Sequence, residues 1–252
     1  MPTFVPRLVV LALLLSACGR PGLSSATTLD SGVVTPGALF VLPASGAVVA
    51  GVAHLLRIHA GDALSAPALS TIEDEFDPVH ARVGGSQRNA LEPELRDGTA
   101  GFEVTFPERG EAMFGCSTRG RVVRVDGAPT LVFRHAKTLL LVGQDALDQP
   151  DAGAAATRRM GLACEIQPML DPMRLRPGDE LPLRVRDVTD PRASAVVRVV
   201  DAAGQIFAGP LDPNGEVRVR LVRSGWHLAT ATIRRADMMI LSTLTFRTGD
   251  KP

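Results

Sequence analysis

Apolar and polar residues alternate most strictly in the second half of the chain, where single apolar residues are separated by arginine, glutamate or proline. Strict alternation is typical of strands with one buried face. Turn signals separate these runs, and Asp212-Pro213-Asn214-Gly215 is a tight turn that joins Gln205–Ala208 to Glu216–Val222. The alternating apolar positions are Leu181, Leu183, Val185, Val197, Val199, Val217, Val219 and Leu221.

The first half has a less regular pattern, in which glycine and proline cut apolar stretches into pieces of strand length. The polar segment Thr71–Gly98 predicts a long loop with one helical turn. We therefore expect an all-β protein made of two tandem Ig-like antiparallel β-sandwich domains. Strands of the first domain are expected near Leu39–Leu42, Val48–Ile58, Phe102–Phe106, Ala112–Ser117, Val122–Val125 and Thr130–Leu141.

Composition shifts suggest the domain boundaries. The stretch QDALDQPDAGAAAT, which begins at Gln144, is rich in alanine, aspartate and glycine and indicates a linker. The predicted organisation is a signal peptide over residues 1–17, a flexible tether over 18–32, an N-terminal sandwich over 33–143, a linker over 144–160 and a C-terminal sandwich over 161–252.

The N-terminus has the order of a secretory signal: Arg7, the short apolar run Leu8–Leu15 and then small residues. Leu15-Ser16-Ala17-Cys18 resembles the lipobox of bacterial lipoproteins, which implies that Cys18 becomes the acylated first mature residue. The alternatives are an ordinary signal peptide with an incidental cysteine, or an uncleaved anchor. Gly19 is not the aspartate that resembles an inner-membrane retention signal, so an outer-membrane location in the bacterial envelope is favoured.

The run from Ala203 to Ile233 resembles the carboxypeptidase-regulatory-like, or transthyretin-like, family of Ig-type sandwiches. The matching features are Gly209, Asp212, Asn214-Gly215, Val217–Leu221 and Gly225-Trp226. The second half is also similar to periplasmic proteins associated with nickel and cobalt transport, although the histidine that such proteins carry near the mature N-terminus is absent here. The resemblance implies an architecture rather than an activity.

Two cysteines remain after Cys18, namely Cys116 and Cys164. In an oxidising compartment this pair can form a disulfide, and the alternative is two buried free thiols.

Composition and motifs exclude several function classes. Acidic and basic residues balance at 27 each, which argues against a nucleic-acid partner. No nucleophile, zinc-protease or phosphate-loop motif is present, and the five histidines lack metal-ligand spacing, so no enzyme activity, cofactor or metal is expected. The acidic run from Glu73 to Asp77 is expected to be a solvated loop rather than a Ca²⁺ site.

Five arginines alternate with the apolar positions of the second half: Arg184, Arg186, Arg198, Arg218 and Arg220. If their strands share a sheet, they form an outward anion-binding face, because guanidinium groups bind carboxylate and phosphate. The alternative is that they only solvate the surface, paired with nearby carboxylates.

Together these observations predict a membrane-anchored envelope lipoprotein that acts as a non-catalytic binding or scaffolding module. Its expected partners are the membrane, through the lipid anchor, and an anionic envelope glycolipid or another envelope protein. The alternative function is that of a periplasmic accessory protein for nickel or cobalt uptake.

Overall fold

The computed structural model describes residues 37–82, 85–88, 91–143, 156–187 and 195–249, and confirms an all-β fold. The predicted signal peptide, Cys18 and the tether lie outside the described residues. No helix in the described ranges is long and apolar enough to cross a membrane. The strands are β1 (Leu39–Pro43), β2 (Ala53–Ala60), β3 (Phe76–Arg82), β4 (Gly85–Arg88), β5 (Glu94–Arg96), β6 (Thr99–Thr105), β7 (Gly110–Thr118), β8 (Arg121–Val125), β9 (Ala128–Val142), β10 (Cys164–Pro168), β11 (Glu180–Asp187), β12 (Val196–Asp201), β13 (Gly204–Pro210), β14 (Glu216–Arg220), β15 (Gly225–Arg234) and β16 (Met238–Thr248), with a short 3₁₀ helix, η2 (Pro172–Arg174).

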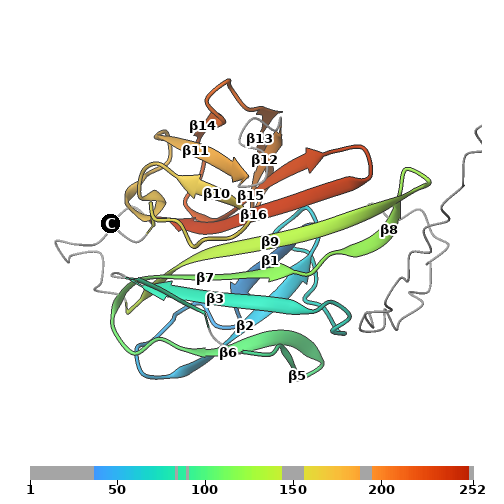
Figure 1. Ribbon diagram of the computed structural model, residues 1–252. Helices are drawn as coiled ribbons and strands as arrows, with labels where there is room; N and C mark the ends of the chain where they lie inside the picture. The colour runs from blue at the N-terminus through green and yellow to red at the C-terminus, as the bar shows by residue number, and fades with distance from the viewer. Residues whose placement is uncertain (1–36, 83–84, 89–90, 144–155, 188–194, 250–252) are drawn as a thin grey trace, which may run out of the picture.

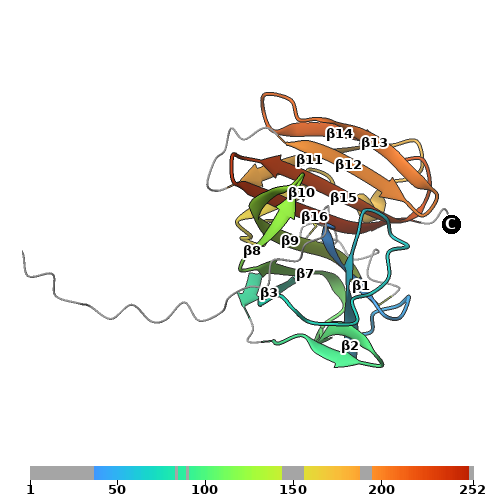
Figure 2. The same cartoon turned by 90° about the vertical axis from the view of Figure 1, so that its right-hand side faces the viewer.

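The strands form three sheets that stack in layers (Figure 1). A four-stranded sheet with the order β1-β2-β6-β5 belongs to the first half, and a three-stranded sheet with the order β10-β11-β14 belongs to the second. Between them lies a nine-stranded sheet. Eight of its strands have the order β13-β12-β15-β16-β9-β7-β3-β4, and the ninth, β8, pairs with β9. The view from the side shows the two small sheets on opposite sides of this central layer (Figure 2).

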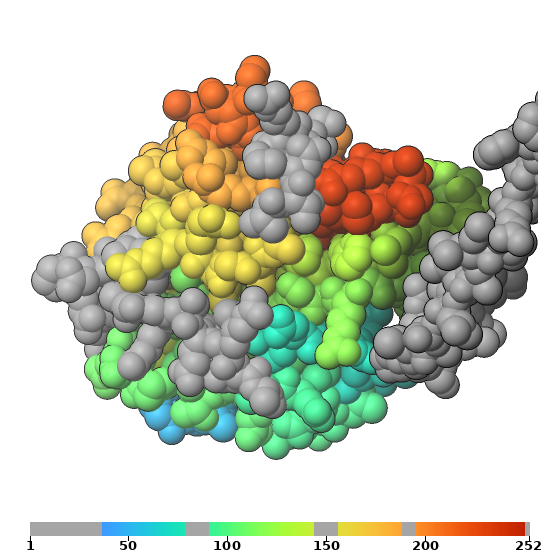
Figure 3. Space-filling model, viewed as in Figure 1, coloured from blue at the N-terminus to red at the C-terminus, as the bar shows by residue number. Residues whose placement is uncertain are grey.

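The central sheet contains strands from both halves of the chain because β9 and β16 pair with each other in parallel, from Leu131↔Met238 to Thr138↔Thr245. All other strand pairs are antiparallel, as expected for Ig-type sandwiches. In the space-filling view, the yellow atoms around β10 lie directly against green atoms of the first half (Figure 3). Each sandwich is therefore built from one small sheet and part of the shared sheet.

Successive side chains of β9 point to opposite faces and pack in the cores of both sandwiches. Ala136 and Leu140 pack in the core of the first half with Leu56, Phe102 and other apolar residues. Leu139, which points to the opposite face, packs in the core of the second half with Ile166 and its neighbours. A strand with both faces buried explains why the sequence from Leu139 to Val142 is continuously apolar.

The loop predicted for Thr71–Gly98 is wrong, because this segment contains β3, β4 and β5. β4 and β5 are mainly polar, and β3 lies in a polar segment and contains Pro78, so the extended conformation depends on pairing with neighbours; β3 adds along β7 and β5 adds along β6. The strand predicted over Val48–Ile58 begins only at Ala53, after a turn with Gly51 at φ 75°.

A buried ion pair connects β9 to β10. The Lys137 ammonium donates to Glu165 Oε1 at 2.7 Å, and the two side chains are 0% and 1% exposed. Lys137 also donates to the carbonyl of Arg158, and the Glu165 carboxylate accepts the backbone N–H of Met160. Burial lowers the pKa of Lys137, while Glu165 acts in the opposite direction. The pair thus joins the two halves and holds the described end of the predicted linker against them.

We expect that Lys137→Met destabilises the fold by about 3 to 5 kcal/mol, since it leaves the carboxylate of Glu165 buried without its counter-charge. The double variant Lys137→Met/Glu165→Gln should recover part of this loss, because the glutamine oxygen still accepts from Met160. Urea unfolding measures both effects. The exposed control Arg124→Met should change the free energy of unfolding by less than about 0.5 kcal/mol; equal stability of Lys137→Met and the control would contradict the role of the pair.

Candidate functional site

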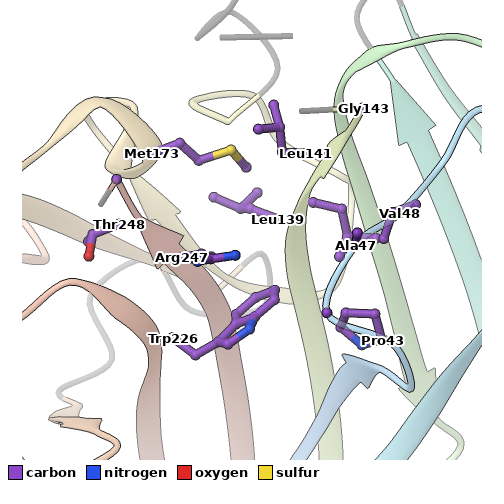
Figure 4. Close-up of a pocket in the computed structure, with 13 residues that line it drawn as sticks. Pro43, Ala47, Val48, Leu139, Leu141, Gly143, Met173, Trp226, Arg247 and Thr248 are labelled. Carbon is purple, nitrogen blue, oxygen red and sulfur yellow. The ribbon is translucent and has the colours of Figure 1, made fainter. Parts of the chain in front are cut away.

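A cleft opens where β9 and β16 separate. Their pairing ends at Thr138↔Thr245; beyond it β9 continues beside β7 to Val142, and β16 continues beside β15 to Thr248. The space between the separating strands is a cleft of about 350 Å³ (Figure 4). The site is therefore a notch in the central sheet, at the boundary between the two halves of the chain.

The cleft lining is mainly apolar, and it draws on both halves of the chain. Arg247 supplies the one ionisable side chain among the described residues that line it. Figure 4 shows Trp226 and Arg247 on the β16 side of the cleft and Leu139 on the β9 side. The main apolar contributors are Val48, Leu139, Leu140, Leu141, Met173 and Trp226.

Trp226, the single tryptophan of the chain, is half-buried at the start of β15 and pairs across the sheet with Arg247. It follows Gly225, whose φ of 106° is a conformation that favours glycine. The family resemblance includes the Gly225-Trp226 pair, but nothing in the sequence indicates that the indole lines a cleft.

The segment before β2 forms the opposite lip of the cleft. Val48 makes a single parallel bridge with Val142, and its carbonyl accepts the N–H of Gly143 at 2.8 Å. His54 Nε2 accepts the N–H of Val49 at 2.9 Å and holds this segment in place. His54 therefore supports the rim of the cleft from outside its lining.

The structure divides the five arginines of the predicted anion-binding face. Arg184, Arg186, Arg218 and Arg220 lie on β11 and β14 of the three-stranded sheet, whereas Arg198 lies on β12 of the central sheet, 3.5 Å from Asp62. The first group shares its sheet with carboxylates: Arg184 pairs with Glu216, and Arg218 lies 3.9 Å from Glu180. This surface therefore carries both signs of charge.

Cys116 and Cys164 are both free, buried thiols in the structure, and they belong to different apolar clusters. Burial raises the pKa of each thiol to about 12. Thiols with such pKa values are not nucleophiles at neutral pH.

The acidic run beside β3 is paired with arginines: Glu73 with Arg121, Asp74 with Arg134, and Glu75 with Arg119. In the described ranges, no three His, Cys, Asp or Glu side chains lie close enough to hold a metal ion.

Comparisons with known proteins give no assignment by sequence: no family model and no curated protein matches the chain. Among solved structures, the BSP domain of a biofilm-associated protein matches at 7% identity over 83% of this chain and 30% of that one, with a TM-score of 0.23. The D0–D1 domain of intimin matches at 10% identity over 84% and 98%, with a TM-score of 0.21. Salmonella α2-macroglobulin matches at 13% identity over 85% and 16%, with a TM-score of 0.26. TM-scores this low support no functional argument, so the fold assignment rests on the strands and their pairing.

His135 is buried on β9, where Ser117 Oγ lies 2.8 Å from its Nδ1. Burial lowers the pKa of His135 to about 4, although the carboxylate of Asp187 acts in the opposite direction. The imidazole is therefore neutral at physiological pH, and it serves as a hydrogen-bonding partner inside the sheet.

We expect the stability of the fold to decrease as the pH falls from about 6.5 to about 4. In this range His135 is protonated in the unfolded chain but not in the folded chain. Protonation should therefore lower the free energy of unfolding by about 3 kcal/mol at pH 4. Urea titrations at pH 7.5, 5.5 and 4.5 measure the slope, and His135→Gln should reduce it. A slope that is the same in the variant would show that His135 does not change its pKa on folding.

Proposed function

We propose that this protein is a bacterial envelope lipoprotein, anchored through acylated Cys18, that acts as a non-catalytic binding module. Its ligand site is the cleft between β9 and β16. The binding role rests on one observation: between two strands of the central sheet lies a mainly apolar cleft, and one guanidinium group lines it among the described residues. Concave, mainly apolar sites with a few polar groups are typical of ligand binding.

The lining defines the chemistry of the ligand. Apolar groups on both walls favour an apolar moiety, and the guanidinium of Arg247 favours an anionic group on the same molecule. An anionic envelope glycolipid and a segment of another envelope protein both have this chemistry, and an anchored module would meet both.

The buried pair of Lys137 and Glu165 and the buried imidazole of His135 fit a non-catalytic role. Lys137 and Glu165 neutralise each other inside the protein, and His135 is neutral within the sheet. None of these three groups lines the cleft. Because no observation on the described residues favours the metal-uptake alternative, it is not proposed.

The lipid anchor is tested by the intact mass of the protein extracted from membranes. A mass that begins at Cys18 and includes acyl chains is expected, and Cys18→Ser should remove the acyl mass because the thiol is the acylation site. Localisation by density-gradient separation of the two membranes should place the protein with the outer membrane. An unmodified mass that begins at another residue would contradict the anchor.

The cleft is tested with anilinonaphthalene sulfonate, a probe that has both an apolar ring system and an anionic group. With a lipid-free chain that starts at Gly19, we expect energy transfer from Trp226 to the bound probe. Ala47→Phe should reduce this transfer at least about fivefold by filling the cleft. The control Ala44→Phe, an exposed change beside the lining residues, should have no effect; equal transfer in both variants would place the probe elsewhere.

A further inference from the structure

We propose that the β1–β2 loop (Ala44–Val52) is a membrane-contact element, which rests in the interfacial region of the bilayer that holds the lipid anchor. The inference rests on the proposed function, because it requires the acylated Cys18. It adds a second contact with the membrane, made by the folded part of the chain.

The β1–β2 loop is exposed and carries no charge. Its sequence, ASGAVVAGV, has one polar side chain, that of Ser45, and no Asp, Glu, Lys or Arg occurs between Asp30 and Arg57. Val49 and Val52 are 50% and 49% exposed. Charged residues make up 21% of the chain, so a loop without any of them is suited to an apolar neighbour. Exposed apolar surface of this kind marks contact with a protein or a membrane.

Polar groups of the loop have partners within the protein. A backbone group that enters an apolar medium without a partner is costly, and these hydrogen bonds remove that cost. They also hold the loop in one conformation, so little ordering is needed when it docks. The hydrogen bonds, at 2.8 to 3.0 Å, join the Ala44 N–H to the Leu55 carbonyl, the Ser45 hydroxyl to the Ala47 carbonyl, the Val49 N–H to His54 Nε2, the Gly51 N–H to the Phe106 carbonyl and the Gly143 N–H to the Val48 carbonyl.

The position of the loop relative to Cys18 allows both membrane contacts at once. The described chain begins at Gly37, and β1 separates this point from the loop by about 17 Å, at about 3.4 Å per residue. Cys18 lies 19 residues before Gly37, and a chain of that length reaches about 65 Å when fully extended. The anchor then holds the loop near the bilayer at an effective concentration on the order of millimolar, so a weak contact is sufficient.

A bilayer fits this loop better than a second copy of the chain does. The loop has nine residues, whereas a stable protein–protein interface takes roughly 20 to 30 residues from each side. The interfacial region of a bilayer requires no matching surface, and it accepts a short apolar segment.

The same loop forms one lip of the cleft. Gly46, Ala47 and Val48 line it, and Figure 4 shows Ala47 and Val48 across the cleft from Trp226. A loop that rests on the bilayer therefore brings the mouth of the cleft to the lipid surface, where the mainly apolar lining suits an acyl chain.

The test uses the lipid-anchored chain in phosphatidylcholine nanodiscs, with Ser45→Cys labelled by a nitrobenzoxadiazole fluorophore. Cys116 and Cys164 are buried, and burial raises the pKa of each thiol to about 12, so only the introduced thiol reacts. We expect the emission to shift to the blue relative to the labelled lipid-free chain that starts at Gly19. Spin-labelled phosphatidylcholine in the nanodisc should quench it.

A label at Ala236→Cys is the positional control. Ala236 is exposed in the turn between β15 and β16, where the Leu131 N–H donates to the carbonyl of Asp237. Leu131 lies near the start of β9, and the Val48↔Val142 bridge lies at its end, so the turn and the loop are at opposite ends of that strand. This label should show neither the shift nor the quenching.

Val49→Asp/Val52→Asp should lower the quenching at residue 45 at least about fivefold, because carboxylates are costly in the apolar part of a bilayer. The matched control Val122→Asp/Val196→Asp changes two valines that are 45% and 56% exposed on β8 and β12. It should be quenched like the unaltered chain. Thermal unfolding of both double variants checks that each is folded.

Four outcomes would overturn the inference. If the label at residue 45 has the same emission with and without the bilayer, the loop does not touch the membrane, and binding of the sulfonate probe would leave the cleft in place. Equal quenching at residues 45 and 236, or in both double variants, would show that the protein adheres without using the loop. If the lipid-free chain is a dimer by light scattering and Val49→Asp/Val52→Asp makes it a monomer, the loop contacts a second copy. An intact mass without acyl chains would remove the anchor, and the proposed function would then fall together with the inference.

Discussion

β9 and β16 come from different halves of the chain and lie side by side in parallel between Leu131↔Met238 and Thr138↔Thr245. Parallel neighbours need a long connection between them, and here the connection includes most of the second sandwich. Because of this pairing, strands from both halves of the chain form one central sheet. One face of β9 is buried in the core of the first half, and the other face is buried in the core of the second. The pairing also determines the site, because the cleft lies where it ends.

The buried pair of Lys137 and Glu165 reinforces the same junction. A charge inside a protein is costly unless it has a partner and further hydrogen bonds, and both groups here have them. The ammonium extends from the shared sheet, and the carboxylate belongs to the edge strand β10 of the small sheet. The arrangement specifies how that sheet sits on β9, since any other position would leave two charges unpaired.

The sequence predicts where individual strands and turns lie better than it predicts which strands pair with each other. Alternation located β11 and β14 because each has one buried face, and turn chemistry located the bend at Asp212. Strand β3 escaped prediction because it lies in a segment that is polar overall, and because its conformation depends on pairing with β7. The parallel pairing could not be predicted, since the apolar pattern of β9 is compatible with any partner. One signal in the sequence points to the buried pair: Lys137 is one of only two lysines in an arginine-rich chain, and it lies just before the apolar run Leu139–Val142.

The candidate site was predictable only in part. The resemblance drew attention to Gly225-Trp226, but Leu139 and Arg247 carry no local signal, because a cleft between separating strands depends on where pairing stops. The predicted arginine face grouped Arg198 with four arginines that lie on another sheet, since alternation shows which face of a strand a residue occupies and not which sheet contains the strand.

Hydrogen–deuterium exchange at increasing urea concentration tests most directly whether one sheet unites the two halves. If β9 and β16 are paired, peptides that contain these strands should lose protection together, at a single urea concentration, with the strands of both sandwiches. Loss of protection in two steps, with β16 and the second half opening while β9 stays protected along its full length, would contradict a shared sheet.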